Sequence, residues 1–174
     1  MNIGCINGRF QPFHNGHFEY LLAAAQKCDH LIIGITQYDP EVTDSDSPKH
    51  RMNQGDNPFT YWDRLRIIKA VVAKSDLATR SVDIVPFPIH SPNMIKNFVD
   101  PQSIMFTTIY DAWNIRKIRR LKENGFQVCA LWRRKVKEIE GKRVRAAMRH
   151  DFQSFETLVP DGVASTVKGI MGLR

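Results

Sequence analysis

Short apolar runs alternate along this chain with longer segments whose apolar residues recur at helical spacing. Residues 31–36 read Leu-Ile-Ile-Gly-Ile-Thr, a nearly all-apolar run of the kind that is buried on both faces of a parallel sheet. Similar runs recur along the chain, so strands are expected at residues 2–6, 31–36, 82–86, 104–108 and 126–132.

Helices are predicted between these strands, over residues 16–26, 60–74 and 111–123, after Gly141 and after Pro160. Thr60 suits the N-cap of the second helix, whose buried face is expected to comprise Trp62, Leu65, Ile68 and Val72. The third helix ends at Asn124-Gly125, a frequent C-cap signal.

The alternation of strands and helices predicts a single Rossmann-like α/β domain spanning residues 1–174. Its five-stranded parallel sheet is expected to carry helices on both faces. The polar stretch 38–56 is rich in Asp, Ser and Pro and is expected to form a long loop that is functional or mobile.

Composition favours a cytoplasmic protein. No apolar run is long enough to span a bilayer, and the N-terminus lacks the pattern of a signal peptide. The three cysteines, Cys5, Cys28 and Cys129, lie far apart in apolar settings and form no Cys-x-x-Cys or Cys/His cluster. Buried, reduced thiols are therefore expected rather than a disulfide or a metal site.

The net charge of +7 is compatible with nucleic-acid binding or with a small, highly anionic substrate. No RNA- or DNA-binding motif accompanies the charge, so a nucleic-acid partner is not expected. Basic residues concentrate at 116–122 and 133–149. The first cluster is interpreted as the solvated face of a helix that buries Ile115, Ile118 and Leu121. The second is either a solvated face or a binding surface for phosphates.

Residues 8–17, Gly-Arg-Phe-Gln-Pro-Phe-His-Asn-Gly-His, join the first strand to the first helix. A glycine loop that enters a helix binds phosphate through free N–H groups and the helix dipole. His14 and His17 are spaced so that both rings face one spot, Gly16 leaves room for a phosphate, and Arg9 supplies a charged fork. Ordinary histidines or a zinc pair are the alternatives, but no third metal ligand lies nearby in the sequence. This pattern predicts nucleotidyl transfer, which depends on positioning and on charge neutralisation.

Residues 8–17 resemble the signature of the HxGH nucleotidyltransferase superfamily, and most closely its archaeal-type nicotinamide mononucleotide (NMN) adenylyltransferases. The resemblance implies that His14 and His17 contact the triphosphate and stabilise the transition state, with Arg9 and Arg145 as further catalytic residues. The nucleotide-binding residues that it implies are Gly8, Arg9, Phe10, Gln11, His14, Gly16, His17, Tyr110, Trp113, Gly141, Lys142 and Arg145.

A second signature of that superfamily, Ser-x-Thr-x-Ile/Val-Arg before a helix, is similar to residues 139–145. Gly141, Val144 and Arg145 match, whereas Glu140 and Lys142 replace the hydroxyl residues. Lys142 is expected to bind phosphate as a point charge, and Glu140 is expected to point away.

The acceptor pocket departs further from the NMN adenylyltransferases. The residues expected to bind the acceptor are Thr36, Asn57, Phe59, Arg64, Pro88 and Asn93. Ile89 and Lys96 stand where the family usually carries an aspartate and a tryptophan, and Asp56 replaces an arginine. Lys49, His50 or Arg51 is expected to supply the missing charge. Trp113 either stacks on a base or belongs to the core, and Trp62 is expected in the core.

The predicted function is transfer of AMP from ATP to a phosphomonoester, with NMN or nicotinate mononucleotide as the best single acceptor and pyrophosphate as the product. The alternative enzyme is a CTP-dependent cytidylyltransferase that activates another phosphorylated metabolite. A nucleotide sensor without turnover is less favoured, because His14, His17, Arg9 and Arg145 are present. Mg²⁺ is expected to arrive with the nucleotide, no metal site of the protein's own is predicted, and the resemblance implies a homo-oligomer without a membrane partner.

Overall fold

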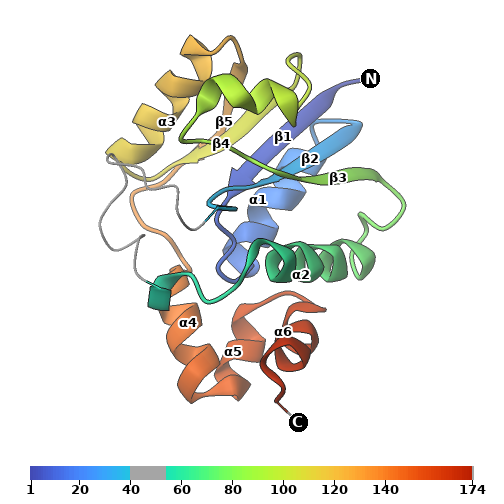
Figure 1. The fold of residues 1–174 in the computed structure, drawn as a ribbon, viewed down its shortest axis with the longest axis vertical. Helices are drawn as coiled ribbons and strands as arrows, with labels where there is room; N and C mark the ends of the chain where they lie inside the picture. Colours follow the sequence, from blue (N-terminus) through green and yellow to red (C-terminus); the bar gives the residue numbers. More distant parts are fainter. Residues whose placement is uncertain (40–53, 174) are drawn as a thin grey trace.

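The computed structural model describes residues 1–39 and 54–173 of the chain. These residues form a five-stranded parallel sheet with helices on both faces (Figure 1). The strands are β1 (Ile3–Gly8), β2 (His30–Ile35), β3 (Ser81–Pro86), β4 (Ile104–Ile109) and β5 (Gln127–Arg133). Their spatial order is β3-β2-β1-β4-β5, so the chain reverses direction across the sheet after β3. The predicted Rossmann-like class and the five predicted strands are confirmed.

The helices follow the sequence expectation with one addition. They are α1 (Asn15–Ala25), α2 (Tyr61–Ala73), α3 (Ala112–Glu123), α4 (Gly141–His150), α5 (Phe152–Leu158) and α6 (Val163–Met171), with 3₁₀ turns η2 (Gln54–Asp56) and η3 (Pro92–Asn97). The short helix α5 was not predicted; its N-cap Asp151 accepts a bond from the backbone N–H of Ser154 at 3.1 Å. Thr60 caps α2 as expected, through a reciprocal bond with Asp63.

The two faces of the sheet are buried in two separate apolar cores. Adjacent residues of the central strands point to opposite faces, as the two-residue period of a strand requires. Ile6 and Phe106 belong to the core shared with α1, α2 and the C-terminal helices. Cys5 and Met105 belong to the core beneath η3 and α3. Strands buried on both faces explain why the sequence shows continuous apolar runs.

Helices α4, α5 and α6 gather beyond one end of the sheet, next to α2 (Figure 1). The turn before α6 comes very close to α2 at Gly162, where an added Cβ would lie 2.8 Å from the carbonyl oxygen of Ala70. Gly162 also has a φ of +91°, a conformation that favours glycine. This contact fixes the C-terminal helices against the body of the fold.

Several burial predictions were wrong. Trp62 is 62% exposed, because α2 turns Arg64, Ile67, Ile68 and Val71 toward the core instead. In α3, Ile115 is 39% exposed whereas Lys117 is buried. Cys129 is only partly buried, although Cys5 and Cys28 are buried, and all three thiols are free. Residues 40–53 of the predicted long loop, with Lys49, His50 and Arg51, lie outside the described residues.

Candidate active site

A cavity of about 240 Å³ opens at the carboxyl ends of the parallel strands, where sheets of this type bind ligands. Its walls come from the ends of β1 and β4, the segment after β2, the start of α1 and one side of α3. The loop between β5 and α4 and the first turn of α4 complete it. The cavity therefore includes most of the signature at residues 8–17.

His14 and His17 lie at the start of α1, His14 as its N-cap and His17 within its first turn. Their ring centroids are 3.7 Å apart with 22° between the planes, so the rings stack. Among the described residues neither Nδ1 atom has a hydrogen-bond partner, although both atoms are buried. An added Cβ at Gly16 would lie 3.3 Å from the His14 ring, so glycine lets the ring pack against the helix start. Because buried polar atoms without partners cost free energy, the pair favours a ligand that bonds to them.

Both histidines are neutral at pH 7. Burial, reinforced by Lys137 and Arg145, lowers the pKa of His14 to about 4. The pKa of His17 is also lowered well below its ordinary value, first by burial and then by His14, Arg9 and Lys137. A neutral imidazole keeps one N–H donor. The histidines therefore offer hydrogen bonds to a phosphate, while Arg9, Lys137 and Arg145 provide the positive charge.

The signature loop is held in place by hydrogen bonds from the side chains of Gln11 and Arg64. The Gln11 amide exchanges two bonds with the backbone of Phe59, at 2.8 and 3.0 Å. Arg64 is 1% exposed and donates to the carbonyl groups of Arg9, Thr36 and Gln37 at 2.7 to 2.8 Å. Arg64 is not among the residues that line the cavity. Its guanidinium instead joins the segment after β1 to the segment after β2.

The second signature meets the first through Arg145. Helix α4 begins at Gly141, as expected, and both Gly141 and Arg145 line the cavity. Arg145 is 6% exposed, donates to the carbonyl oxygen of Gln11 at 3.1 Å and forms an ion pair with Asp56. Lys142 and Glu140 are not among the lining residues. The start of α4 therefore faces the histidines with a guanidinium and a glycine.

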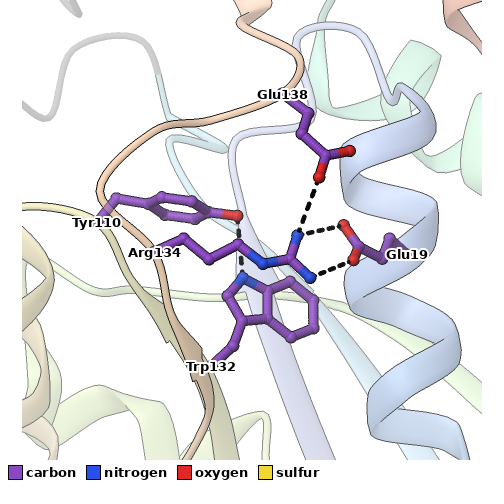
Figure 2. Close-up of polar contacts among 5 residues, drawn as sticks. All are labelled: Glu19, Tyr110, Trp132, Arg134 and Glu138. Atoms are coloured by element: carbon purple, nitrogen blue, oxygen red, sulfur yellow. Dashed lines mark hydrogen bonds and ion pairs between the residues drawn. The ribbon is translucent and has the colours of Figure 1, made fainter.

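A five-residue polar cluster, the Arg134 clamp, ties the loop before α4 to α1 (Figure 2). Both terminal nitrogens of Arg134 donate to the carboxylate of Glu19, at 2.7 and 3.1 Å. The guanidinium also lies 4.6 Å from the Trp132 ring centroid and 3.7 Å from Glu138. Trp132 in turn donates to the hydroxyl of Tyr110 at 3.0 Å. Because all five residues line the cavity, the clamp forms part of its wall.

The residues expected to bind the acceptor are dispersed. Thr36 lines the cavity, and Pro88 lines a small adjoining hollow. The side chain of Asn57 accepts a bond from Arg9 at 3.2 Å, and Phe59 is buried. Asn93 lines neither the cavity nor the hollow. Tyr110 and Trp113, expected beside the nucleotide base, both line the main cavity.

The sequence of residues 5–134 matches the model of the cytidylyltransferase-like family. The chain belongs to this family. The match runs from β1 through β5, so it includes the histidine pair and the strand ends that form the cavity. Together with the relatives below, it makes the chain a nucleotidyltransferase that transfers a nucleotide to a phosphorylated acceptor.

Both a cytidylyltransferase and an adenylyltransferase align with nearly the whole chain. A phosphonoformate cytidylyltransferase of Streptomyces viridochromogenes is 36% identical over 167 residues, 95% of this chain and 90% of its own length. A nicotinamide-nucleotide adenylyltransferase of Archaeoglobus fulgidus is 31% identical over 175 residues, 96% of this chain and 91% of its own length. The predicted family resemblance is confirmed.

Solved structures support the fold. A bifunctional NMN adenylyltransferase/ADP ribose pyrophosphatase from Francisella tularensis aligns with a TM-score of 0.63 at 18% identity. The alignment covers 98% of this chain and 50% of that one, so the nucleotidyltransferase spans about half of its structural neighbour.

Sequence reasoning missed several residues that line the cavity of the nucleotidyltransferase. These are chiefly Asn7, Glu19, Lys117, Trp132, Arg134 and Lys137. Glu19 and Arg134 are 115 positions apart, so their pairing has no local signal. Lys117 was assigned to a solvated face, and only its burial in the fold distinguishes it from its basic neighbours.

Among the described residues we find neither a candidate metal site nor a membrane-spanning helix. These residues contain no cluster of three or more His, Cys, Asp or Glu side chains suited to a metal ion. No helix within them is both long and apolar enough to cross a membrane.

Proposed function

We propose that this nucleotidyltransferase uses CTP and a small acceptor that carries a phosphonate or phosphate group. The observation that carries this choice is Ile89, which is 3% exposed and lines the cavity. In the NMN adenylyltransferases that residues 8–17 resemble, an aspartate usually stands at this position. An apolar side chain at this position offers no charged partner to a nicotinamide nucleotide. The 36% identity to a phosphonoformate cytidylyltransferase agrees with the choice of CTP and a phosphonate.

The proposed reaction is a direct displacement at the α-phosphorus. An oxygen of the acceptor attacks it, a new P–O bond forms, and the bond to the bridging oxygen breaks, so that pyrophosphate leaves with the electron pair. His14 and His17 donate hydrogen bonds to the oxygens on which charge develops. Arg9, Lys137 and Arg145 neutralise the triphosphate. The triphosphate oxygens would hold a Mg²⁺ ion, which would supply further charge neutralisation there.

A second candidate function is transfer of AMP from ATP to NMN. It is supported by nicotinamide-nucleotide adenylyltransferases at 29 to 31% identity and by the shared Gly-Arg-Phe-Gln-Pro-Phe-His form of the signature. In both candidates Tyr110 and Trp113 are proposed to contact the base, because both line the cavity. Trp113 is half-buried at the start of α3, where its ring forms a flat apolar wall.

A two-by-two assay separates the candidates. CTP or ATP is combined with phosphonoformate or NMN in the presence of Mg²⁺, and pyrophosphate release is followed. We expect the highest kcat/KM with CTP and phosphonoformate. Turnover confined to ATP with NMN would replace the first candidate by the second, and absence of pyrophosphate in all four mixtures would contradict both.

We further propose a cytoplasmic homo-oligomer. The resemblance of residues 8–17 to the archaeal-type NMN adenylyltransferases supports this assembly, and the exposed Trp62 on α2 is a candidate contact residue. Light scattering after size-exclusion chromatography measures the mass, and a mass of 20.0 kDa would refute the oligomer.

A further inference from the structure

A buried lysine lines the cavity from helix α3, where Arg116, Arg119 and Lys122 are exposed. Lys117 lies in the middle of α3 and is 7% exposed, whereas its neighbour Arg116 is exposed. Its ammonium donates to Asn7 Oδ1 at 3.4 Å and lies 5.7 Å from the Trp113 ring centroid. Lys117 therefore brings a positive charge to the wall of the cavity.

Asn7 supplies an independent observation at the same place. It precedes the last residue of β1, is 6% exposed and lines the cavity. Its Oδ1 atom faces Lys117, and its buried Nδ2 atom has no hydrogen-bond partner among the described residues. A ligand oxygen beside Lys117 provides that partner. The pair therefore offers two donors, one of them charged, to a single small group.

This subsite is separate from the phosphate-binding part of the cavity. The cations that lower the pKa values of His14 and His17 are Arg9, Lys137 and Arg145. Lys117 instead acts on the buried Cys5 thiol, whose pKa burial raises and Lys117 opposes. Its hydrogen bond to Asn7 places Lys117 beside the end of β1, the central strand of the sheet. A ligand that touches both the histidines and Lys117 needs two polar ends.

We propose that Lys117 and Asn7 bind a carboxylate of the acceptor, so that the substrates are small phosphonates or phosphates that also carry a carboxylate. The two carboxylate oxygens match the ammonium and the Asn7 Nδ2 donor. The buried Ile89 lines the same cavity and keeps water from these bonds, which strengthens them. The positively charged pyridinium ring of NMN is repelled by Lys117. This inference rests on the proposed function for the placement of the phosphonate at the histidines.

The test compares two acceptors that differ only in the carboxylate region, phosphonoformate and methylphosphonate. Binding of each to the intact protein is measured by isothermal titration calorimetry without nucleotide, for the wild type, Lys117→Met and Arg116→Met. We expect the wild type to bind phosphonoformate about 10- to 100-fold more tightly than methylphosphonate, the range for a hydrogen-bonded charge. Lys117→Met should remove this preference, and the matched exposed variant Arg116→Met should keep it.

Asn7→Asp provides a second variant that retains the side-chain volume. It places a negative charge beside the carboxylate and should weaken phosphonoformate binding more than methylphosphonate binding. The proposal is overturned if the wild type does not distinguish the two ligands, or if Lys117→Met keeps the preference. It is also overturned if Lys117→Met weakens CTP binding by the same factor, because Lys117 would then serve the nucleotide.

The binding assay tests the subsite, and the turnover assay tests the proposed function, so the two proposals can be refuted separately. Preference for phosphonoformate that depends on Lys117, without pyrophosphate release from CTP, contradicts the proposed function and leaves the subsite in place. Turnover with CTP and phosphonoformate that Lys117→Met does not affect contradicts the subsite alone.

Discussion

His17→Ala removes one of two stacked imidazoles and leaves α1 intact, because alanine is the strongest helix former. The imidazole is proposed to donate a hydrogen bond to the oxygens that gain charge in the transition state. Loss of one such donor costs about 10²- to 10³-fold in kcat, or roughly 3–4 kcal/mol of transition-state stabilisation. We expect a decrease of this size, with a smaller effect on the KM for CTP.

The effect of His17→Ala on stability is expected to be small, although His17 is packed rather than exposed. Its ring lies 3.7 Å from that of His14 and 5.0 Å from that of Phe10, so truncation removes apolar contacts. Truncation also removes a buried Nδ1 atom that has no partner among the described residues, which relieves about 1–3 kcal/mol. The two terms oppose each other, so the Tm should change by less than about 5 °C.

Pyrophosphate release at saturating CTP and acceptor gives kcat, and differential scanning calorimetry gives the Tm. His30→Ala is the matched control, because His30 lies at the start of β2, pairs with Asp83 at 3.0 Å and does not line the cavity. A His17→Ala rate within threefold of the wild-type rate would refute the proposed role of the histidine pair. A similar rate loss in His30→Ala would show that the assay reports on folding.

Three further changes test the surrounding framework. The folded-state pKa of His14, about 4, lies below the unfolded value of 6.5. The free energy of unfolding should therefore fall by about 3 kcal/mol as the pH drops from 6.5 to 4. Urea unfolding over this pH range should show a smaller decrease for His14→Gln than for the wild type. Arg64→Met leaves buried carbonyl groups without donors and should lower the free energy of unfolding by about 3–5 kcal/mol in urea titrations, whereas an unchanged midpoint would contradict its structural role. Glu19→Gln weakens the Arg134 clamp and should raise the KM for CTP several-fold at nearly constant Tm, while Glu156→Gln, which alters a surface pair with Lys168, should leave KM unchanged.

The fold was predictable because each strand carries its own signal. A strand buried on both faces needs a continuous apolar run, and the 31–36 run sits in a sheet with cores on both sides. Signals at helix ends were equally local, as the reciprocal bond between Thr60 and Asp63 illustrates. Helix α5 was missed although Asp151 is a suitable N-cap, because its seven residues provide barely two turns of periodicity.

Burial within the predicted helices was less predictable. Trp62 satisfies the spacing of a buried face in α2, yet the core accepts Arg64 because three backbone carbonyls are available to its guanidinium. The preference for apolar residues in cores is a statement about averages, and a charged side chain is buried when hydrogen bonds compensate its desolvation. The sequence does not show where strand ends leave carbonyl groups unpaired.

The residues of the candidate site also differ in how far the sequence predicts them. The histidines, Gly16 and Arg9 lie within ten residues of one another, so their chemistry could be inferred from spacing alone. The proposed acceptor side consists of side chains that only the fold brings together, such as Asn7 on β1 and Lys117 on α3, 110 positions apart. A cavity selects its ligand partly by the charge on its walls. Ile89 stands in place of an expected aspartate, and Lys117 adds a positive charge, so both features make the wall less negative. Both changes make the wall less favourable to a cationic ring and more favourable to an anion. The reaction class therefore follows from the signature, whereas the proposed acceptor class depends on the fold.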